Sequence, residues 1–235
     1  MAALAGCGKP QVARGINDPY ETHNRAVHEL NRDIDRTLLK PASSGVGSAL
    51  PEPARRGISN FAGNFGLPSS IVNDLLQANI DDAASNTVRL LINTTFGLGG
   101  ILDPATAWGL PARDTDFGET LHVWGFAEGH YVELPLLGPS TKRDAIGGFV
   151  DLFTNPLSYI LPSPKRYAGP VAGAVSKVGD RDRFGDTIDS ILYDSADSYA
   201  QARLLYLESR RFKLGGGNSD STYDGYDDYD DFYSE

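Results

Sequence analysis

The stretch NDPYETHNRAVHELNRDIDRTLLKP, residues 17–41, carries the clearest helix signal in the chain. Asp18 is a good N-cap, Pro19 suits the first helical position, and Glu21 can close a capping box. Apolar side chains then recur at three- and four-residue spacing, at Val27, Leu30, Ile34 and Leu38. The spacing predicts an amphipathic helix with one apolar stripe, ended by Lys40-Pro41.

Further short helices are expected along the chain, each bounded by proline, glycine or a capping residue. Their expected starts are Pro51-Glu52-Pro53, Ser69, Asp81, Asp103-Pro104, Asp116 and Ser140, and two more helices are expected over residues 180–192 and 195–212. Gly66 and Pro68 are expected to break the helix that precedes Ser69. Residues 155–170 are expected to form a connection punctuated by prolines.

Residues 131–137, YVELPLL, are the one stretch that reads as extended. Pro135 lies inside it and cannot donate a hydrogen bond to a sheet, which favours an isolated segment over a central strand. The sequence contains neither strand-turn-strand repetition nor an alternation of strands with helices. It therefore predicts an all-α fold built from short amphipathic helices.

The composition narrows the class of protein. The chain has 235 residues, of which 40% are hydrophobic and 22% charged, which is enough to bury a core. The formal net charge is −10, but residues 215–235 hold seven acidic residues and no basic one, so the remainder is close to neutral at −3. This balance argues against nucleic acid as a partner.

The tail, residues 215–235, places Tyr223, Tyr226, Tyr229 and Phe232 at every third position among aspartates. Its composition predicts a disordered, solvated segment, and partner binding is the alternative. The spacing of its acids is not that of an EF-hand calcium loop.

The N-terminus carries the only cysteine. Leu4-Ala5-Gly6-Cys7 resembles a bacterial lipobox, the cleavage and lipidation site of lipoproteins. In that interpretation residues 1–6 are the remnant of a signal peptide. Cys7, carrying acyl chains such as palmitate, then begins a lipidated linker over residues 7–17. The alternative is a free cysteine near the terminus. No stretch of about 20 apolar residues is present, so no transmembrane helix is expected.

Motifs for catalysis and metal binding are missing. The chain has no Gly-x-Ser-x-Gly elbow, no Ser-x-x-Lys pair, no His-Glu-x-x-His and no phosphate loop. Its four histidines lack the spacing of metal ligands, so we expect no metal, no cofactor and no catalytic residue. Asp114, Asp116 and Glu119 are expected to cap helices, and a set of paired acids is the alternative.

Several longer blocks of sequence carry a family resemblance. They are Asn17-Asp18-Pro19-Tyr20-Glu21 with Asn24-Arg25, residues 46–55, Ile58-Ser59-Asn60-Phe61, residues 72–77, residues 89–103 (RLLINTTFGLGGILD), residues 116–129 (DFGETLHVWGFAEG) and residues 131–144 (YVELPLLGPSTKRD). In order and spacing they resemble the MlaA/VacJ outer-membrane lipoproteins over about residues 7–213. The resemblance assigns residues 18–214 to one helical domain, and the acidic tail lies outside it.

This resemblance implies both a fold and a function. Members form a ring of short amphipathic helices in the inner leaflet of the outer membrane, lipid-anchored at its periplasmic face, with an amphipathic central channel. They have no known enzymatic activity. They take phospholipids from the outer leaflet and hand them to a periplasmic carrier protein, in association with a trimeric porin, which maintains lipid asymmetry.

Three alternatives remain open at this point. The first is a structural envelope lipoprotein that binds a partner through its acidic, tyrosine-rich tail. The second is an envelope lipid hydrolase, against which the missing nucleophile motifs weigh. The third is an ordinary helical domain with a buried core, because its apolar stripes would look the same.

The site residues that follow are few. Gly97, Gly99 and Gly100 are expected either to cap a helix or to form a hinge that borders the channel. Lys142 and Arg143 are expected either to be solvated surface charges or to meet lipid phosphates. Cys7 is the expected lipid anchor.

Overall fold

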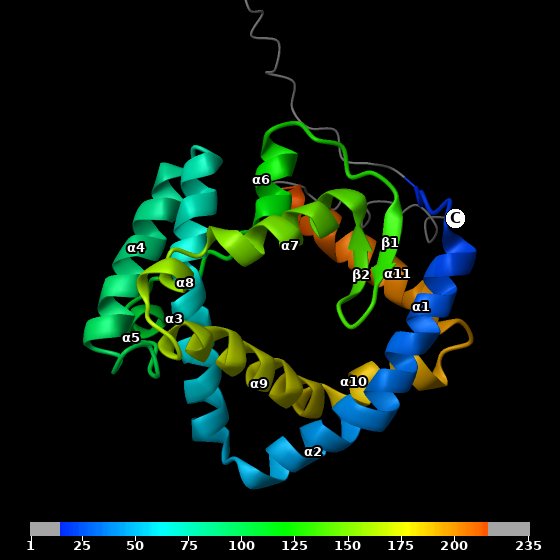
Figure 1. Ribbon diagram of the computed structural model, residues 1–235, viewed down its shortest axis with the longest axis horizontal. Helices are drawn as coiled ribbons and strands as arrows, with labels where there is room; N and C mark the ends of the chain where they lie inside the picture. The colour runs from blue at the N-terminus through cyan, green and yellow to red at the C-terminus, as the bar shows by residue number, and fades with distance from the viewer. Residues whose placement is uncertain (1–14, 216–235) are drawn as a thin grey trace, which may run out of the picture.

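The structure is a computed structural model that describes residues 15–215. Its elements follow one another around a ring with a central opening (Figure 1). In chain order they are α1 (Glu21–Ile34), η1 (Asp35–Leu39), α2 (Lys40–Ala49), α3 (Glu52–Leu76), α4 (Ile80–Thr95), α5 (Pro104–Ala107), α6 (Phe117–Val123), β1 (Tyr131–Leu134), β2 (Gly138–Thr141), α7 (Lys142–Thr154), α8 (Leu157–Ile160), η2 (Lys165–Tyr167), α9 (Ala168–Arg183), α10 (Gly185–Asp189), η3 (Ser190–Asp194) and α11 (Ser198–Leu214). The ring of short helices confirms the predicted all-α architecture.

The opening has four sides. α7 and the β-hairpin border one side, and α9 borders the side opposite (Figure 1). α3 lies at one end of the opening and α1 at the other, while α4 and α5 lie on the outer side of α3 (Figure 1). The ring closes at α11, where Arg203 pairs with Asp18 and Arg211 donates to the Gly15 carbonyl at 2.7 Å, which brings the two ends of the described chain together. The predicted tail, residues 215–235, lies outside the described residues apart from Gly215.

The first helix does not end at Lys40-Pro41 as predicted. A π-helical turn, η1, connects α1 directly to α2, and Pro41 lies in the first turn of α2. The prediction was wrong because the π-helical turn changes the hydrogen-bond register just before Pro41. Pro41 then lies in the first turn of a helix, where a missing N–H removes no helical hydrogen bond. Asp18 is also not the N-cap, since α1 begins after Tyr20 without a side-chain cap.

The predicted break at Gly66 and Pro68 is also wrong. α3 runs unbroken across both residues, and Ser69 lies inside it. The α3 helix packs against α4 on one side and α9 on another, and such tertiary contacts override a local breaker. The Asn155 side chain also donates to the Phe65 carbonyl at 2.9 Å, beside the proline.

Two predicted caps are confirmed and two are shifted. Asp103 caps α5 through the Thr106 N–H, and Asp116 caps α6 through the Glu119 N–H. α4 is capped by Asn79 in place of Asp81, and α7 by Thr141 in place of Ser140. The shifts are of one or two residues, as expected where several capping residues adjoin one another.

The extended segment is not isolated. β1 pairs antiparallel with β2, with Tyr131 opposite Thr141 and Leu134 opposite Gly138. The prediction failed because Pro135 lies in the turn, where its missing N–H costs nothing. The second strand, GPST, carries no sequence signal of its own.

The C-terminal third differs from prediction in its boundaries. The expected connection over residues 155–170 contains α8 and η2 and leads into α9. The helix expected over residues 180–192 is divided among α9, α10 and η3. The last helix, α11, is capped by Asp197 and starts three residues later than expected.

The apolar core is small. It consists of Tyr131, Tyr199 and Leu207, with Tyr206 packed against them, where the hairpin meets α11. The rings of Tyr131 and Tyr199 meet edge to face, with centroids 5.9 Å apart. No helix within residues 15–215 is both long and apolar enough to cross a membrane.

Candidate functional site

The pattern of burial is the reverse of that in a water-soluble domain. Among the described residues, 20 buried residues are polar or charged and eight are hydrophobic, whereas 32 large hydrophobic side chains are exposed. Water-soluble proteins bury their apolar residues first, and large exposed apolar surfaces mark contact with a membrane or a partner. The seams between these helices are therefore polar, and much of the molecule's exterior is apolar.

One polar seam, which we call the amide seam, runs along α3 and α4. Its members are Asn64, Asn73, Asp74, Asn86 and Asn93, all buried. Asn86 Nδ2 donates to Asp74 Oδ2 at 2.8 Å, and Asn73 Nδ2 donates to Asp151 Oδ1 of α7 at 3.1 Å. Burial raises the pKa of Asp74 above its ordinary value. These hydrogen bonds satisfy groups that the apolar outer faces cannot.

We call the part of the ring formed by α3, α4 and α5 the arm. Apolar side chains lie exposed on its surface. They include Leu75, Leu91, Phe96, Leu98 and Trp108, and Phe96 and Trp108 pack together with ring centroids 5.6 Å apart. The arm thus has a polar interior and an apolar surface. Lipid or another apolar partner would cover such a surface.

A second polar seam, which we call the clasp, closes the ring. Three arginines of α11 form it together with acids from elsewhere in the chain. Arg203 pairs with Asp18, Arg210 with Asp116 and Asp144, and Arg211 with Glu128. Burial alone would raise the pKa of Asp144, but hydrogen bonds and charge from Arg210 outweigh it and leave that pKa lowered. The clasp joins residues 66 to 185 positions apart.

The predicted glycines lie in the loop after α4, beside α5 on the outer arm. A side chain at Gly97 would place its Cβ 2.4 Å from the Asn93 carbonyl oxygen. Gly100 has φ +96° and its N–H donates to that same carbonyl at 2.9 Å. The predicted helix end is confirmed, because α4 stops at Thr95 and these residues form the turn. The hinge that borders the channel stays a prediction.

The two predicted cations occupy different environments. Lys142 is exposed at the start of α7. Arg143 is 5% exposed, with Nε 3.3 Å from Asp144 Oδ1 and Nη1 3.3 Å from His122 Nδ1. Burial lowers the pKa of His122, and the positive charge of Arg143 adds to that effect. The neutral imidazole can therefore accept a hydrogen bond from Arg143.

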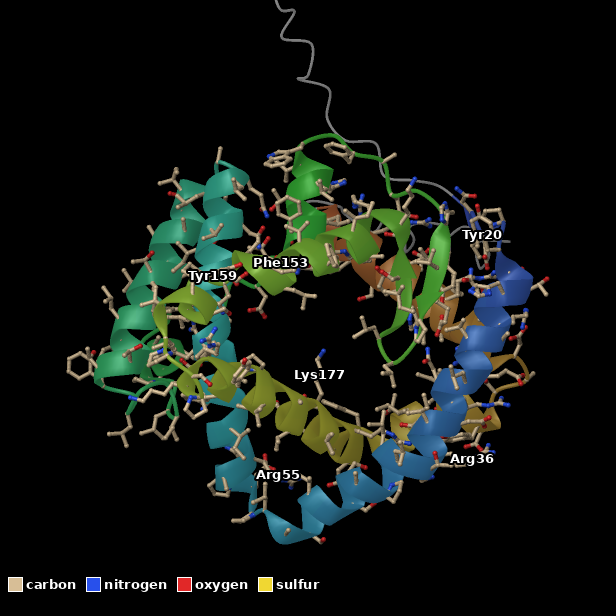
Figure 2. The ribbon with its side chains drawn as sticks, in the orientation of Figure 1. Tyr20, Arg36, Arg55, Phe153, Tyr159 and Lys177 are labelled. Atoms are coloured by element: carbon tan, nitrogen blue, oxygen red, sulfur yellow. The ribbon has the colours of Figure 1, made fainter. Side chains whose placement is uncertain are left out.

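The two long sides of the opening differ in polarity. Lys177 of α9 reaches into it (Figure 2). The side chain is exposed and forms no ion pair within the described part of the chain. On the side opposite, the hairpin turn reaches over the opening and carries Leu136 and Leu137, which are 71% and 75% exposed (Figure 1). The opening thus combines a cation with an apolar rim.

One buried group has the order of a hydrolase triad. Ser198 Oγ lies 3.0 Å from His28 Nε2, and His28 Nδ1 lies 3.3 Å from Glu133 Oε1. The Glu133 carboxylate also accepts from Tyr131 and Asn31, and all three members are buried between α1, β1 and α11. We interpret this chain of hydrogen bonds as packing that secures α1 to α11. No group of three metal-ligating side chains occurs among residues 15–215.

A ring with polar seams, an apolar exterior and an opening of mixed character defines a membrane-associated helical protein, not a globular domain around an apolar core. The comparisons give its family. A family model described as MlaA lipoprotein matches residues 16–213, so the chain belongs to the MlaA lipoprotein family.

Named relatives and a solved structure agree with this assignment. The intermembrane phospholipid transport system lipoprotein MlaA of Escherichia coli (strain K12) is 31% identical over 219 residues, which span 91% of this chain and 85% of that protein. The protein of that name in Haemophilus influenzae is 31% identical over 223 residues, spanning 92% and 87%. A solved chain described as the "Structural basis for maintenance of bacterial outer membrane lipid asymmetry" matches with a TM-score of 0.72 and 32% identity, over 86% of this chain and 100% of that one.

Sequence reasoning missed the residues that organise the ring. The amide seam was visible only as asparagines recurring beside apolar residues in α3 and α4. The clasp arginines carried no signal, because arginines on a helix are normally solvated. Lys177 carried no signal, because a lone lysine on a helix is normally surface.

Proposed function

We propose that this protein is a lipid-anchored lipoprotein of the outer membrane that moves phospholipids out of the outer leaflet through the opening of its ring. The observation that carries the proposal is the reversed burial of the ring, with polar seams inside and apolar side chains outside. The names of its relatives support phospholipid as the substrate. The proposal requires a non-enzymatic protein, since lipid is moved and not cleaved.

The mixed character of the opening gives the proposal a physical basis. Moving a charged headgroup through hydrocarbon is costly, because the headgroup loses its water. In our proposal the headgroup passes along polar groups such as Lys177, while the acyl chains stay beside apolar side chains of the hairpin. The predicted roles of Lys142, Arg143 and the glycines at 97, 99 and 100 in lipid handling stay predictions.

The partners in this proposal follow from the family resemblance. A periplasmic carrier protein would accept the phospholipid, which makes a passive path sufficient, and a trimeric porin would hold the ring in the outer membrane. Cys7, which lies outside the described residues, would carry the anchoring acyl chains at the periplasmic face. More than one chain is needed for firm anchoring.

The test is the amount of phosphatidylethanolamine in the outer leaflet of intact cells, measured with an amine reagent that does not cross membranes. Deleting the gene should raise this amount and increase sensitivity to detergent with chelator. The wild-type gene should restore both. Unchanged surface phosphatidylethanolamine in the deletion strain would contradict the proposal.

A charge reversal examines the opening directly. Lys177→Glu should fail to restore the outer leaflet, because a carboxylate repels the lipid phosphate. Lys165→Glu in η2 makes the same change in net charge and serves as the matched control. Equal rescue by both variants would exclude a role for the opening's cation.

The anchor and the tail have their own tests. Cys7→Ala should release the protein from the outer-membrane fraction, and firm retention there would refute the anchor. Removal of residues 215–235 should leave transport intact. Loss of function on that removal would favour the alternative, a lipoprotein that binds a partner through its tail.

A further inference from the structure

A cavity of about 630 Å³ lies between the hairpin, α7 and α11. Its volume is in the range of small-molecule sites, about 300–1,000 Å³. Leu137 belongs both to the cavity wall and to the hairpin turn that reaches over the opening (Figure 1). The cavity therefore adjoins the proposed route of the lipid.

One wall of the cavity is apolar. Leu134, Leu137 and Pro139 supply it from the hairpin, and Ala145, Phe149 and Leu152 supply it from one face of α7. Phe149 and Leu152 are 64% and 70% exposed, so these side chains lack a cover. Their spacing of four and three residues places them in one row along the helix.

The floor of the cavity is polar but already paired. Arg210 Nη1 and Nη2 donate to the two oxygens of Asp116 at 2.8 and 2.7 Å, and Nε donates to Asp144 Oδ2 at 3.1 Å. The Tyr206 hydroxyl donates to Asp144 Oδ2 at 2.7 Å. Asp151 accepts from Asn73 Nδ2 and from the Phe117 N–H. Hydrogen bonds within the fold therefore occupy these groups.

The charge of the floor decides between occupants. Arg210 is the one cation of the floor, and it is already paired with Asp116 and Asp144, so it offers no free positive charge to a phosphate or a fatty-acid carboxylate. The chain's own tail begins five residues after Arg210, but its seven acidic residues would find no free cation there either. An uncharged apolar chain needs no such partner.

We propose that this cavity holds one acyl chain of a phospholipid in transit while the headgroup stays in the opening. The inference rests on the proposed function and adds to it a defined acyl-chain site. Burial of methylene groups against Leu137, Phe149 and Leu152 would supply the attraction.

The test uses the full chain in nanodiscs with a phosphatidylcholine that carries a photoreactive diazirine midway along one acyl chain. After irradiation, mass spectrometry should locate adducts on Leu134, Leu137, Phe149 or Leu152. A phosphatidylcholine with its diazirine in the headgroup should leave these residues unlabelled. Adducts confined to the outer arm, at Phe96 or Trp108, would overturn the proposal.

A cavity-filling variant makes the test specific. Gly148 lines the cavity, and an added Cβ there meets no atom within 4 Å. Gly148→Phe should reduce labelling of the cavity at least about tenfold, the effect of excluding about two buried methylene groups. Gly63→Phe in α3 is the matched control, because Gly63 is equally open and lies outside this cavity. Leu137→Ser, which removes part of the apolar wall without filling the space, should also reduce labelling.

The outcomes separate this inference from the proposed function. Equal cavity labelling in Gly148→Phe and Gly63→Phe would overturn the acyl-chain site. Labelling of the cavity that rises when residues 215–235 are removed would also overturn it, because the tail would then be the occupant. If the cavity is unlabelled while gene deletion still raises outer-leaflet phosphatidylethanolamine, the proposed function stands and the site falls. If the cavity is labelled but the deletion changes nothing, the site stands without transport.

Discussion

The amide seam and the clasp both join elements of the ring through buried polar groups, but with different chemistry. The amide seam is mainly neutral and joins α3 to the next helix, α4, as in Asn86 with Asp74, 12 residues apart, and to α7 through Asn73 with Asp151, 78 residues apart. The clasp uses full charges and joins Arg203 of α11 to Asp18, 185 residues apart. One seam forms a local arm, and the other closes the chain on itself.

The difference reflects what surrounds each seam. The arm has an apolar outer surface, and inside it buried asparagine amides donate to the carboxylates of Asp74 and Asp103, while Arg89 is its one buried arginine and pairs with Asp103. The clasp lies beside the small tyrosine core, where each arginine has a carboxylate partner. The clasp is therefore the place where removal of one group should do the most damage.

The largest effect is expected from Arg210→Ala. This change leaves Asp116 and Asp144 without their common partner, and breaking a buried pair typically costs about 3–5 kcal/mol. The side chain of Arg210 is 11% exposed. The expected result is a loss of most of the unfolding free energy, measured by denaturant titration in detergent and by loss of helical circular dichroism at lower denaturant. Arg56→Ala, which removes an exposed pair with Glu52, should change stability by at most about 0.5 kcal/mol.

The next largest effect is expected from Asp74→Asn, because the carboxylates of the two seams contribute to stability with opposite dependence on pH. The pKa of Asp74 is raised in the fold, so its contribution favours folding at low pH and declines as pH rises from its unfolded value through the raised one. At neutral pH the ionised carboxylate is a cost. Asp74→Asn should remove that cost and stabilise the arm at pH 7 by about 1 kcal/mol per unit of pKa difference.

The carboxylates of the clasp give stability the opposite dependence on pH. The lowered pKa values of Asp116 and Asp144 give stability that is present above the unfolded value of each carboxyl and is lost as pH falls through the lowered one. Denaturant titrations from pH 7 to pH 3 should therefore show the advantage of Asp74→Asn shrinking with acid. An advantage that is constant with pH would mean that the pKa of Asp74 is the same in the folded and the unfolded chain.

The sequence predicted what is local and missed what is distant. The caps at Asp103 and Asp116 and the helix end before Gly97 were predictable, because each depends on residues within a few positions. The strand β2 was not, since GPST becomes a strand only by pairing with β1. Asp18 looked like a helix cap because nothing nearby shows that its carboxylate accepts from Arg203 and Tyr199 of the last helix.

For the candidate functional site, too, the sequence predicted local features and missed distant contacts. The ring and its mixed opening came from the family resemblance, since apolar stripes alone fit a buried core equally well. Arg143 was predicted, with Lys142, either to be a solvated surface charge or to meet lipid phosphates, yet it is buried beside His122. The row of Ala145, Phe149 and Leu152 was not predicted, because apolar residues also lie at Ile146, Val150 and Phe153 and only the facing hairpin selects this row.

A smaller effect is expected at the edge of the clasp, from Ser198→Ala. If Ser198 only joins α11 to His28, the change should cost about 1 kcal/mol, the worth of one hydrogen bond, and leave lipid transport intact. Outer-leaflet phosphatidylethanolamine and the release of fatty acid from a phospholipid vesicle measure the two properties. Fatty-acid release by the wild-type protein that disappears in Ser198→Ala would revive the hydrolase alternative.

The smallest effect is expected in the turn that connects the two helices of the arm. Ala78 has φ +58°, a left-handed conformation that disfavours residues with a Cβ, and it follows the C-cap of α3. Relief of that strain in Ala78→Gly is partly offset by the greater freedom of glycine in the unfolded chain, so the net gain should be about 0.5 kcal/mol. The midpoint of denaturant unfolding should rise slightly without a change in slope. Because Ala78 and Arg210 share no contact, combining Ala78→Gly with Arg210→Ala should give additive changes, and strong coupling between them would show that the turn of the arm and the clasp interact energetically.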